Sequence, residues 1–331
     1  MEINTILKNV VQSIGIIQPY TETFDIYSFT LPEEAIPKQR IDGIVKLSNG
    51  ITRCKLVYNT IINNGQYGLI QNVIRSPSIQ ATHLAVKRPR SPQMSLEPEA
   101  FLQALCSTIT EANGLNGAIP KVYDIFIFAN EVRFTMDFVD GINYIQFLQL
   151  HWSETFFLNS ILQLAYILYV LERNIGFDHR DMNPNNIWIR TKPQPQTYTL
   201  NIEGVHYRIA FTHQVVLLDF GFACIGDGVT RVTRLSLGKV IPHIDTCPKD
   251  GRDMFHILNH LLTTPFVKNN ITQSLYSQIV NWMSPFSVAE SHLAQIWTSN
   301  PDFKILKLTP KSLIETLAER VQPAANSIRT T

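Results

Sequence analysis

Apolar residues in the first part of the chain gather in short runs of strand-forming residues. Two such runs lie between Leu56 and Ile74 and flank the segment Asn63-Asn64-Gly65-Gln66-Tyr67-Gly68. A glycine-containing turn between two strand-like runs is typical of a β-hairpin. A third run, from His83 to Lys87, predicts one more strand.

The next segment changes from strand-like to helical spacing and back again. From Glu97 to Ile109 the apolar residues recur at helical spacing, and Pro98 suits the first turn of a helix. The runs Val122–Phe128 and Val132–Val139 then predict a pair of strands around a short turn. This part of the chain is therefore expected to be mainly sheet with one helix.

After Gly141 the pattern becomes mainly helical. Residues 156–173 predict a long helix, and further helices are expected from Asp253 onward. Strand-like runs within residues 191–214 predict an inserted hairpin between these helices. The pattern as a whole predicts an α+β fold.

The boundaries follow from these changes of pattern. Residues 1–58, which begin with a helical spacing of apolar side chains, are expected to form an N-terminal extension associated with the β-rich part. Residues 59–139 form the β-rich half, and residues 140–331 form the mainly helical half.

Composition narrows the classes of function. The chain has 331 residues, 45% of them hydrophobic, and a net charge of +1, which predicts a sizeable core and argues against nucleic-acid binding. The first residues lack a basic segment followed by an apolar one, so no secretory signal is expected. The most apolar stretch, residues 156–171, contains polar side chains and is short, so it predicts a buried helix and no membrane span.

The cysteines are far apart in the sequence and form no C-x-x-C pair: Cys54, Cys106, Cys224 and Cys247. This spacing favours reduced, buried thiols over a disulfide framework, as is usual in an intracellular, cytoplasmic protein.

The candidate chemistry lies in three pieces of sequence at fixed spacing: His179-Arg180-Asp181, then Asn186, and, after a strand-like run, Asp219-Phe220-Gly221. Asp181 is placed to orient and deprotonate an attacking hydroxyl. Asn186 and Asp219 offer oxygen ligands to Mg²⁺ (or Mn²⁺) at the phosphates of a nucleotide. These pieces therefore predict a phosphoryl-transfer site that uses ATP.

With these motifs, residues 60–265 resemble the eukaryotic-type protein kinases. Leu84-Ala85-Val86-Lys87 is similar to the strand whose lysine holds the α- and β-phosphates in that family. The sequence Asn63-x-Gly65-x-x-Gly68-x-Ile70 resembles the loop that covers the phosphates, with asparagine replacing its first glycine. The resemblance implies a bilobal fold, with ATP between a β-rich small lobe and a helical large lobe.

The same resemblance implies the contacts of the adenine. Met136 corresponds to the gatekeeper, and the backbone of Asp137 and Val139 to the hinge. Ala85 would leave room above the ring, and Asn143 joins the cofactor-binding residues by the same similarity.

A glutamate that pairs with Lys87 is expected in the helix that follows. Glu97 and Glu99 are both candidates, and Glu99 is favoured because it lies deeper in the helix. The alternative for either residue is a first-turn acid that complements the helix dipole.

The chain departs from the family in its catalytic loop and in the segment after the Asp219 motif. Asn183 occupies the position where serine/threonine kinases usually carry a lysine, so a charge that stabilises the transferring phosphate is missing. Arg180 is the residue that reads a phosphorylated activation segment in the family, which makes Thr230, Thr233 and Ser236 candidate phosphorylation sites. The segment has no A-P-E closing sequence, a divergence similar in style to the kinases encoded by large DNA viruses. Asp253-Met254-Phe255, however, resembles the start of the buried helix whose aspartate braces the catalytic-loop backbone in the family.

The resemblance thus implies a protein kinase that transfers the γ-phosphate of ATP to a protein hydroxyl, with Ser/Thr as the expected acceptor and the bulky Phe222 favouring serine over threonine. The asparagine at position 183 leaves the choice between Ser/Thr and Tyr open. The partner is a protein substrate, and the oligomeric state stays open. If the chain is viral, it acts in the host cytoplasm or the virion. Two alternatives remain: a pseudokinase that binds nucleotide as a scaffold, and a small-molecule kinase of the aminoglycoside or choline type.

Overall fold

The computed structural model describes residues 3–17, 31–64, 68–77, 83–91, 95–227, 247–249, 251–284 and 308–321. The chain divides into two compact units. Unit 1 comprises Met1–Ile109, Ile119–Val139 and Thr233–Lys239, and unit 2 comprises Thr110–Ala118, Asp140–Val232 and Val240–Thr331.

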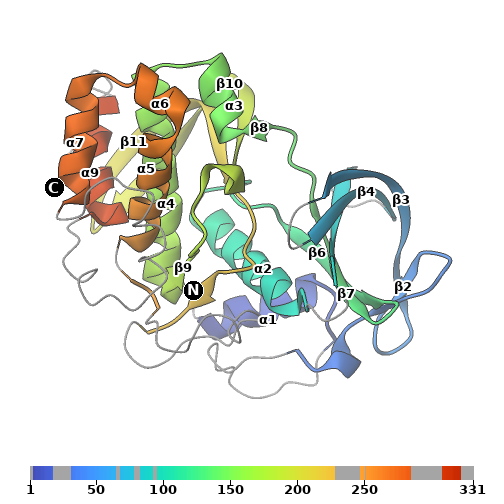
Figure 1. Ribbon diagram of the computed structural model, residues 1–331. Helices are drawn as coiled ribbons and strands as arrows, with labels where there is room; N and C mark the ends of the chain where they lie inside the picture. Colours follow the sequence, from blue (N-terminus) through green and yellow to red (C-terminus); the bar gives the residue numbers. More distant parts are fainter. Residues whose placement is uncertain are drawn as a thin grey trace. The chain divides into compact units, whose positions relative to one another are not determined.

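A closed barrel dominates unit 1 (Figure 1). Its strands are β1 (Lys38–Gln39), β2 (Ile44–Lys46), β3 (Thr52–Asn64), β4 (Gly68–Ser76), β5 (Leu84–Pro89), β6 (Val122–Phe128) and β7 (Glu131–Asp137). They follow the order β1-β2-β3-β4-β5-β7-β6, and β1 pairs in parallel with β6 to close the ring. The predicted hairpin (β3–β4), third strand (β5) and strand pair (β6–β7) are confirmed.

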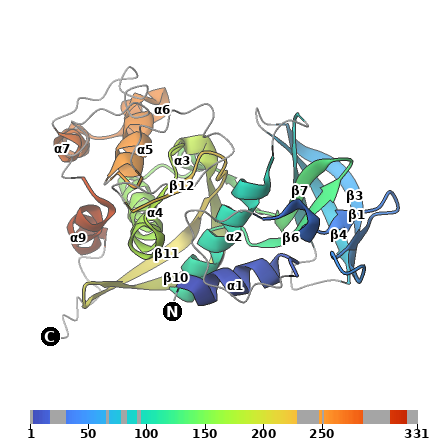
Figure 2. The same ribbon diagram turned by 90° about the horizontal axis from the view of Figure 1, so that it is seen from below.

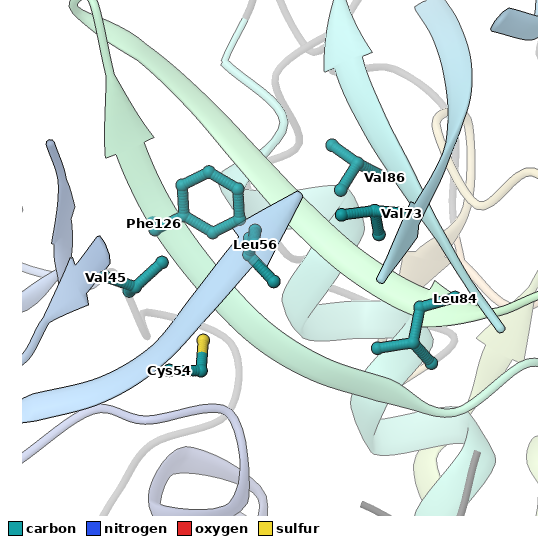
Figure 3. Close-up of a cluster of buried hydrophobic side chains, with 7 residues drawn as sticks. All are labelled: Val45, Cys54, Leu56, Val73, Leu84, Val86 and Phe126. Carbon is teal, nitrogen blue, oxygen red and sulfur yellow. The ribbon is translucent and has the colours of Figure 1, made fainter. Parts of the chain in front are cut away.

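The barrel is filled by apolar side chains from five of its strands. Because alternate residues of a strand point to the same face, Cys54 and Leu56 of β3 face inward together, as do Leu84 and Val86 of β5. Figure 3 shows these four side chains with Val45, Val73 and Phe126, all at most 2% exposed. This core positions the strand that carries Lys87.

A buried cluster of charges joins three strands of the same unit. Asp124 of β6, which is fully buried, accepts hydrogen bonds from Arg53 Nε at 2.6 Å and from Arg75 Nε at 2.9 Å. The hydroxyl of Thr135 donates to it at 2.8 Å. Burial raises the pKa of Asp124, but the hydrogen bond from Arg75 and the charge of Arg53 outweigh burial, and the net shift is downward.

The residues expected to form an N-terminal extension are part of unit 1. The helical spacing at the start forms α1 (Ile3–Ser13), and η1 (Glu33–Ala35) precedes the barrel. β1, β2 and the first half of β3 are barrel strands, so position 58 falls inside a strand. The two short strands contain too few residues for their pairing to be read from a local pattern. The predicted helix after β5 is α2 (Glu97–Ala112).

Unit 2 is mainly helical, with several short strands and one long hairpin. Its elements are β8 (Ile142–Asn143), α3 (Tyr144–Leu150), α4 (Glu154–Ile175), β9 (Phe177–Asp178), η2 (Pro184–Asn186), β10 (Ile187–Ile202), β11 (Val205–Leu217), β12 (Cys224–Ile225), α5 (Arg252–Thr263), α6 (Pro265–Asn270), α7 (Gln273–Met283) and α9 (Pro310–Val321).

The central helix of unit 2 is α4. Ser153 caps its start by accepting a hydrogen bond from the Phe156 N–H at 3.0 Å, and Gly176 ends it in the left-handed conformation, with φ of 60°. By length and composition this helix could cross a bilayer, but 72% of its most apolar window is buried inside the unit. The prediction of a buried core helix is confirmed.

The predicted hairpin is confirmed, but its two strands extend beyond the expected range of residues 191–214 at both ends. β10 begins directly after Asn186 and β11 ends shortly before Asp219, so the two motifs lie at the base of one long hairpin (Figure 2). The pairing of the two strands has a register shift between Thr191 and Gln196. The helix α4 carries polar side chains toward β11: Asn159 donates to the Ala210 carbonyl at 3.1 Å and Gln163 to the His213 carbonyl at 3.0 Å. These bonds explain why polar side chains interrupt the apolar pattern of α4.

The prediction of four reduced cysteines is wrong for one pair. Cys224 and Cys247 form a disulfide across 23 positions of sequence, whereas Cys54 and Cys106 are free and buried. The pair was missed because sequence spacing carries no information about two cysteines that distant segments bring together.

Candidate active site

The catalytic-loop motif of unit 2 is held by its backbone. The carboxylate of Asp253, in the first turn of α5, accepts hydrogen bonds from the N–H of His179 at 2.6 Å and from the N–H of Arg180 at 2.9 Å. Burial, and then the charge of Asp178, raise the pKa of Asp253 to about 7. The brace from Asp253, expected from the kinase resemblance, is confirmed. It fixes the turn in which Arg180 has a φ of 65°, a conformation that residues other than glycine rarely adopt.

Two asparagines hold the side chain of Asp181. Asn183 donates to Oδ1 at 3.0 Å and Asn186 donates to Oδ2 at 2.8 Å, so each carboxylate oxygen receives one amide N–H. Asn183 also accepts a hydrogen bond from the N–H of Asn185 at 3.0 Å and thereby caps η2. The carboxylate is half-buried and its orientation is set by two neutral donors.

The backbone brings Asn186 next to the Asp219 motif. The N–H of Leu218 donates to the Asn186 carbonyl at 2.9 Å, one residue before Asp219. Asp219 has a φ of 61°, and such a left-handed residue turns the chain sharply after the buried strand β11. Because the amide nitrogen of Asn186 donates to Asp181, its side-chain oxygen is the atom left to bind a cation, and the carboxylate of Asp219 is the second candidate ligand. Side-chain oxygens of this kind are the ligands that Mg²⁺ and similar divalent ions prefer.

A buried aromatic cluster supports this turn from behind. The ring of His179 lies 5.4 Å from that of Phe220, and its Nε2 is 2.9 Å from the Leu218 carbonyl oxygen. Burial lowers the pKa of His179, so the imidazole is neutral and donates to that carbonyl. His179 therefore connects the two motifs and has a structural role.

The charged pair of unit 1 is formed by Lys87 and Glu99. Lys87 Nζ lies 2.5 Å from Glu99 Oε1, and both residues are buried. Glu97 makes a different bond, accepting from the Leu31 N–H at 3.1 Å. A Cβ on Gly68 would lie 3.0 Å from Lys87 Cε and 3.1 Å from the Arg88 carbonyl oxygen, so glycine permits β4 to approach the lysine.

The residues expected around the adenine lie in the same barrel. Ile70 is opposite Lys87 in the β4–β5 ladder, and Ala85 is opposite Met136 in the β5–β7 ladder. The N–H of Asp137 already donates to the Lys121 carbonyl at 3.0 Å, so only its carbonyl remains for a ligand. Val139 is half-buried at the end of unit 1. Gly65 and the side chain of Asn63 lie outside the described residues.

Asn143 contacts the catalytic loop of unit 2. Its Nδ2 donates to the Pro184 carbonyl at 3.1 Å, and its Oδ1 accepts from the Ile145 N–H at 2.9 Å, which caps α3. The side chain thus holds η2 in place. The candidate phosphorylation sites Thr230, Thr233 and Ser236 lie outside the described residues.

Two features of the site had no account from the sequence. Asp178, which directly precedes the catalytic loop, is fully buried and pairs with the buried Arg252 of α5. Asn183 orients Asp181, although the sequence indicated only a missing lysine. The only sequence signal for the pair was the charge of Asp178 in an apolar run. Its partner Arg252 is 74 positions away, and no local pattern identifies that partner.

Comparison with known proteins gives one partial similarity. No protein-family model matches the chain. The chain is 28% identical over 97 residues to "Probable kinase 098L" of Invertebrate iridescent virus 3, a match that covers 29% of this chain. It spans 18% of the length of that protein. The match indicates that part of the chain is kinase-like, and it carries no information about the substrate.

Proposed function

We propose that this protein is an ATP-dependent protein kinase of bilobal fold, which transfers the γ-phosphate to a protein hydroxyl, with Ser/Thr favoured as the acceptor. The observation that carries the proposal is the fixed carboxylate of Asp181, held by Asn183 and Asn186. Asp219 directly follows Leu218, whose N–H is bonded to the Asn186 carbonyl. The partial similarity to a viral protein described as a kinase agrees with it.

In this proposal Asp181 accepts the proton of the attacking hydroxyl. Its two oxygens are already oriented by amide N–H groups, so little ordering is needed when the acceptor binds. The backbone bonds from His179 and Arg180 to Asp253 hold the same loop from the other side. The base is therefore preorganised by neutral donors.

Asn186 and Asp219 would bind Mg²⁺, which, when bound, neutralises charge on the phosphates. Lys87 of unit 1 contributes the phosphate anchor, and Glu99 keeps its ammonium in place and charged. By the kinase resemblance, the backbone at Asp137 and Val139 would contact the adenine.

The test measures transfer of label from [γ-³²P]ATP in the presence and absence of Mg²⁺. The acceptors are casein, myelin basic protein, choline and an aminoglycoside, so the product identifies the class of acceptor. We expect label on protein serine or threonine, and a loss of about 10³-fold in Asp181→Asn. Asn185→Ala is the control, because Asn185 is exposed in the same loop.

Equal metal-dependent ADP formation by the native protein and Asp181→Asn would eliminate the kinase proposal. The second candidate is a nucleotide-binding pseudokinase, favoured by the absence of a charged residue at Asn183. It predicts saturable ATP binding in a thermal-shift assay with no transfer to any acceptor.

Label on choline or the aminoglycoside, and none on protein, would show that the acceptor is a small molecule.

A further inference from the structure

A covalent link joins the strand after the Asp219 motif to a segment just before α5. Cys224, in β12, is bonded to Cys247, and both side chains are fully buried. Both belong to unit 2. The bond therefore connects the two ends of the segment that follows the metal-binding motif.

Asp178 holds the same two ends without a covalent bond. β12 pairs with β9, and in that ladder Cys224 is the partner of Asp178. Asp178 Oδ2 also accepts from the Lys249 N–H at 2.8 Å and pairs with Arg252. One residue directly before the catalytic loop thus contacts both sides of the disulfide, Cys224 through its backbone and the Cys247 side through its carboxylate.

The backbone around the bond is closely packed. The N–H of Gly226 donates to the Gly176 carbonyl at 2.9 Å. A Cβ on Gly176 would lie 1.9 Å from the Gly226 carbonyl oxygen, so the chain can approach only at a glycine. Cys247 and Pro248, by contrast, lie in a bend outside any helix or strand. Displacing this bend disturbs less structure than moving β12.

The chemistry around Asp178 differs between the two oxidation states of the cysteines. A carboxylate oxygen of Asp178 and the two sulfur atoms all lie within 4.8 Å of one another. Oδ1 of Asp178 has no hydrogen-bond partner among the described residues. A disulfide sulfur cannot donate, whereas each thiol of the reduced pair can. Reduction would supply a donor to a buried acceptor that otherwise lacks one, and this lowers the cost of reduction.

We propose that Cys224–Cys247 is a reversible thiol–disulfide site, a modification site that takes a dithiol as its reductant. The dithiol passes two electrons and two protons to the pair. Its thiolate attacks one sulfur, the Cys224–Cys247 bond breaks, a mixed disulfide forms, and the second thiolate then closes the oxidised dithiol and releases the second cysteine. In the reduced protein the bonds from Asp178 to the Lys249 N–H and to Arg252 remain.

The functional consequence rests on the proposed kinase activity. The disulfide fixes Cys224 and Cys247 beside Asp178, directly before the catalytic loop, and this link is proposed to support transfer to a protein acceptor. Reduction is expected to lower transfer to protein at least five-fold, while the KM for ATP stays unchanged.

The experiment treats the full-length protein with a graded series of dithiothreitol concentrations, without denaturant. Peptide mapping measures the fraction of the protein in which Cys224 and Cys247 are disulfide-bonded. Hydrogen exchange measures the amide exchange rates of β9, β12 and the start of α5. Labelled ATP measures the rate of phosphotransfer. The test variant is C224S/C247S, and the matched control is C54S/C106S, which removes the two buried free thiols. We expect at least three-fold faster exchange at β9 and β12 in reduced protein and in C224S/C247S, with no dithiol response in the latter.

Three results would overturn the proposal: no disulfide in protein purified without reductant, a bond that dithiothreitol reduces only when the whole protein unfolds, or unchanged exchange at β9 and β12 after reduction. Stoichiometric zinc in protein that lacks the disulfide would instead assign Asp178 and the two cysteines to a metal. A change in exchange with no phosphotransfer in either state keeps the reversible site and rejects the kinase function.

Discussion

The candidate site residues of unit 1 and those of unit 2 orient their charged groups in different ways. In unit 1 a buried lysine is matched by a buried glutamate, Lys87 with Glu99. In unit 2 the carboxylate of Asp181 is held by the amides of Asn183 and Asn186, and its loop by backbone bonds to Asp253. One region fixes a cation with an anion, and the other fixes an anion with neutral donors.

The difference determines what each region needs from outside. A matched ion pair is close to neutral and keeps its geometry without a ligand, although removing one partner leaves a buried charge. Carboxylates held by amides retain their negative charge, so a cation can still be attracted to Asp181 and Asp219. Unit 2 should therefore depend on a metal, whereas unit 1 should depend on its internal pair.

The largest expected effect comes from the metal-binding side of unit 2. Asp219→Ala removes one of two proposed ligands and should lower phosphotransfer about 10³-fold. Removing divalent ions with EDTA should lower the native activity by a similar factor and have little further effect on the variant. Initial rates with labelled ATP measure both. Asp42→Ala, an exposed carboxylate of unit 1, is the control, and an Asp219→Ala activity within three-fold of native would refute the metal assignment.

Breaking the pair in unit 1 should affect both activity and stability. Lys87→Met should reduce phosphotransfer about 10²-fold and destabilise the unit by about 3 kcal/mol, because it removes the cation that is paired with the buried Glu99 carboxylate. The double variant K87M/E99L removes both charges and should recover most of the stability but none of the activity. Urea unfolding and initial rates separate the two effects. If activity returned in the double variant, Lys87 would have no role beyond structure.

The two units should also respond differently to acid. In unit 2, burial lowers the pKa of His213 to about 4, below its unfolded value of about 6.5. At this side chain the unfolded chain therefore binds more protons below pH 6.5, and the contribution of His213 to the stability of unit 2 should fall by up to about 3 kcal/mol as the pH falls from 6.5 to 4. The raised pKa of Asp253 acts in the opposite direction over the same range, so the effect of His213 is measured against a variant that lacks its ring. In unit 1 the pKa of Asp124 is lowered from its usual value of 3.8. The contribution of this carboxylate to the stability of unit 1 should therefore be lost only below pH 3.8.

Tryptophan emission is suited to this test, because all four tryptophans belong to unit 2. Hydrogen exchange of β3 and β6 follows unit 1. His213→Gln, which removes the titrating ring that lies 2.9 Å from the Ser160 hydroxyl, should remove the His213 contribution, so that unit 2 of the variant loses less stability between pH 6.5 and 4 than native unit 2. A single transition with the same midpoint for both probes would contradict the difference between the units.

The smallest expected effect tests the neutral donors themselves. Asn183→Ala removes one amide from the Asp181 carboxylate and the cap of η2, and it should lower kcat about ten-fold. The KM for ATP should not change, since Asn183 orients the base and is not assigned to nucleotide binding. Steady-state kinetics beside Asn185→Ala measure the split. A change in the KM for ATP with constant kcat would move Asn183 to the nucleotide site.

Local patterns determined much of the chain correctly. The hairpin β3–β4, the helix α2 and the long helix α4 each follow from the spacing of their own apolar residues. The kinase-like motifs also identified Asp253 as the brace of the catalytic loop, as the hydrogen bonds to His179 and Arg180 confirm. These features depend on residues that are close in sequence or belong to one motif.

The tertiary structure alone decided the partnerships between distant residues. Closure of the barrel by β1 and β6, the ion pair of Asp178 with Arg252, and the disulfide of Cys224 with Cys247 each join segments that no local period relates. The sequence by itself determined which segments form helices and strands and which side chains can carry chemistry, because those depend on local spacing and residue type. Which buried charges and thiols meet depends on how the strands and helices pack, and therefore only the folded chain could show it.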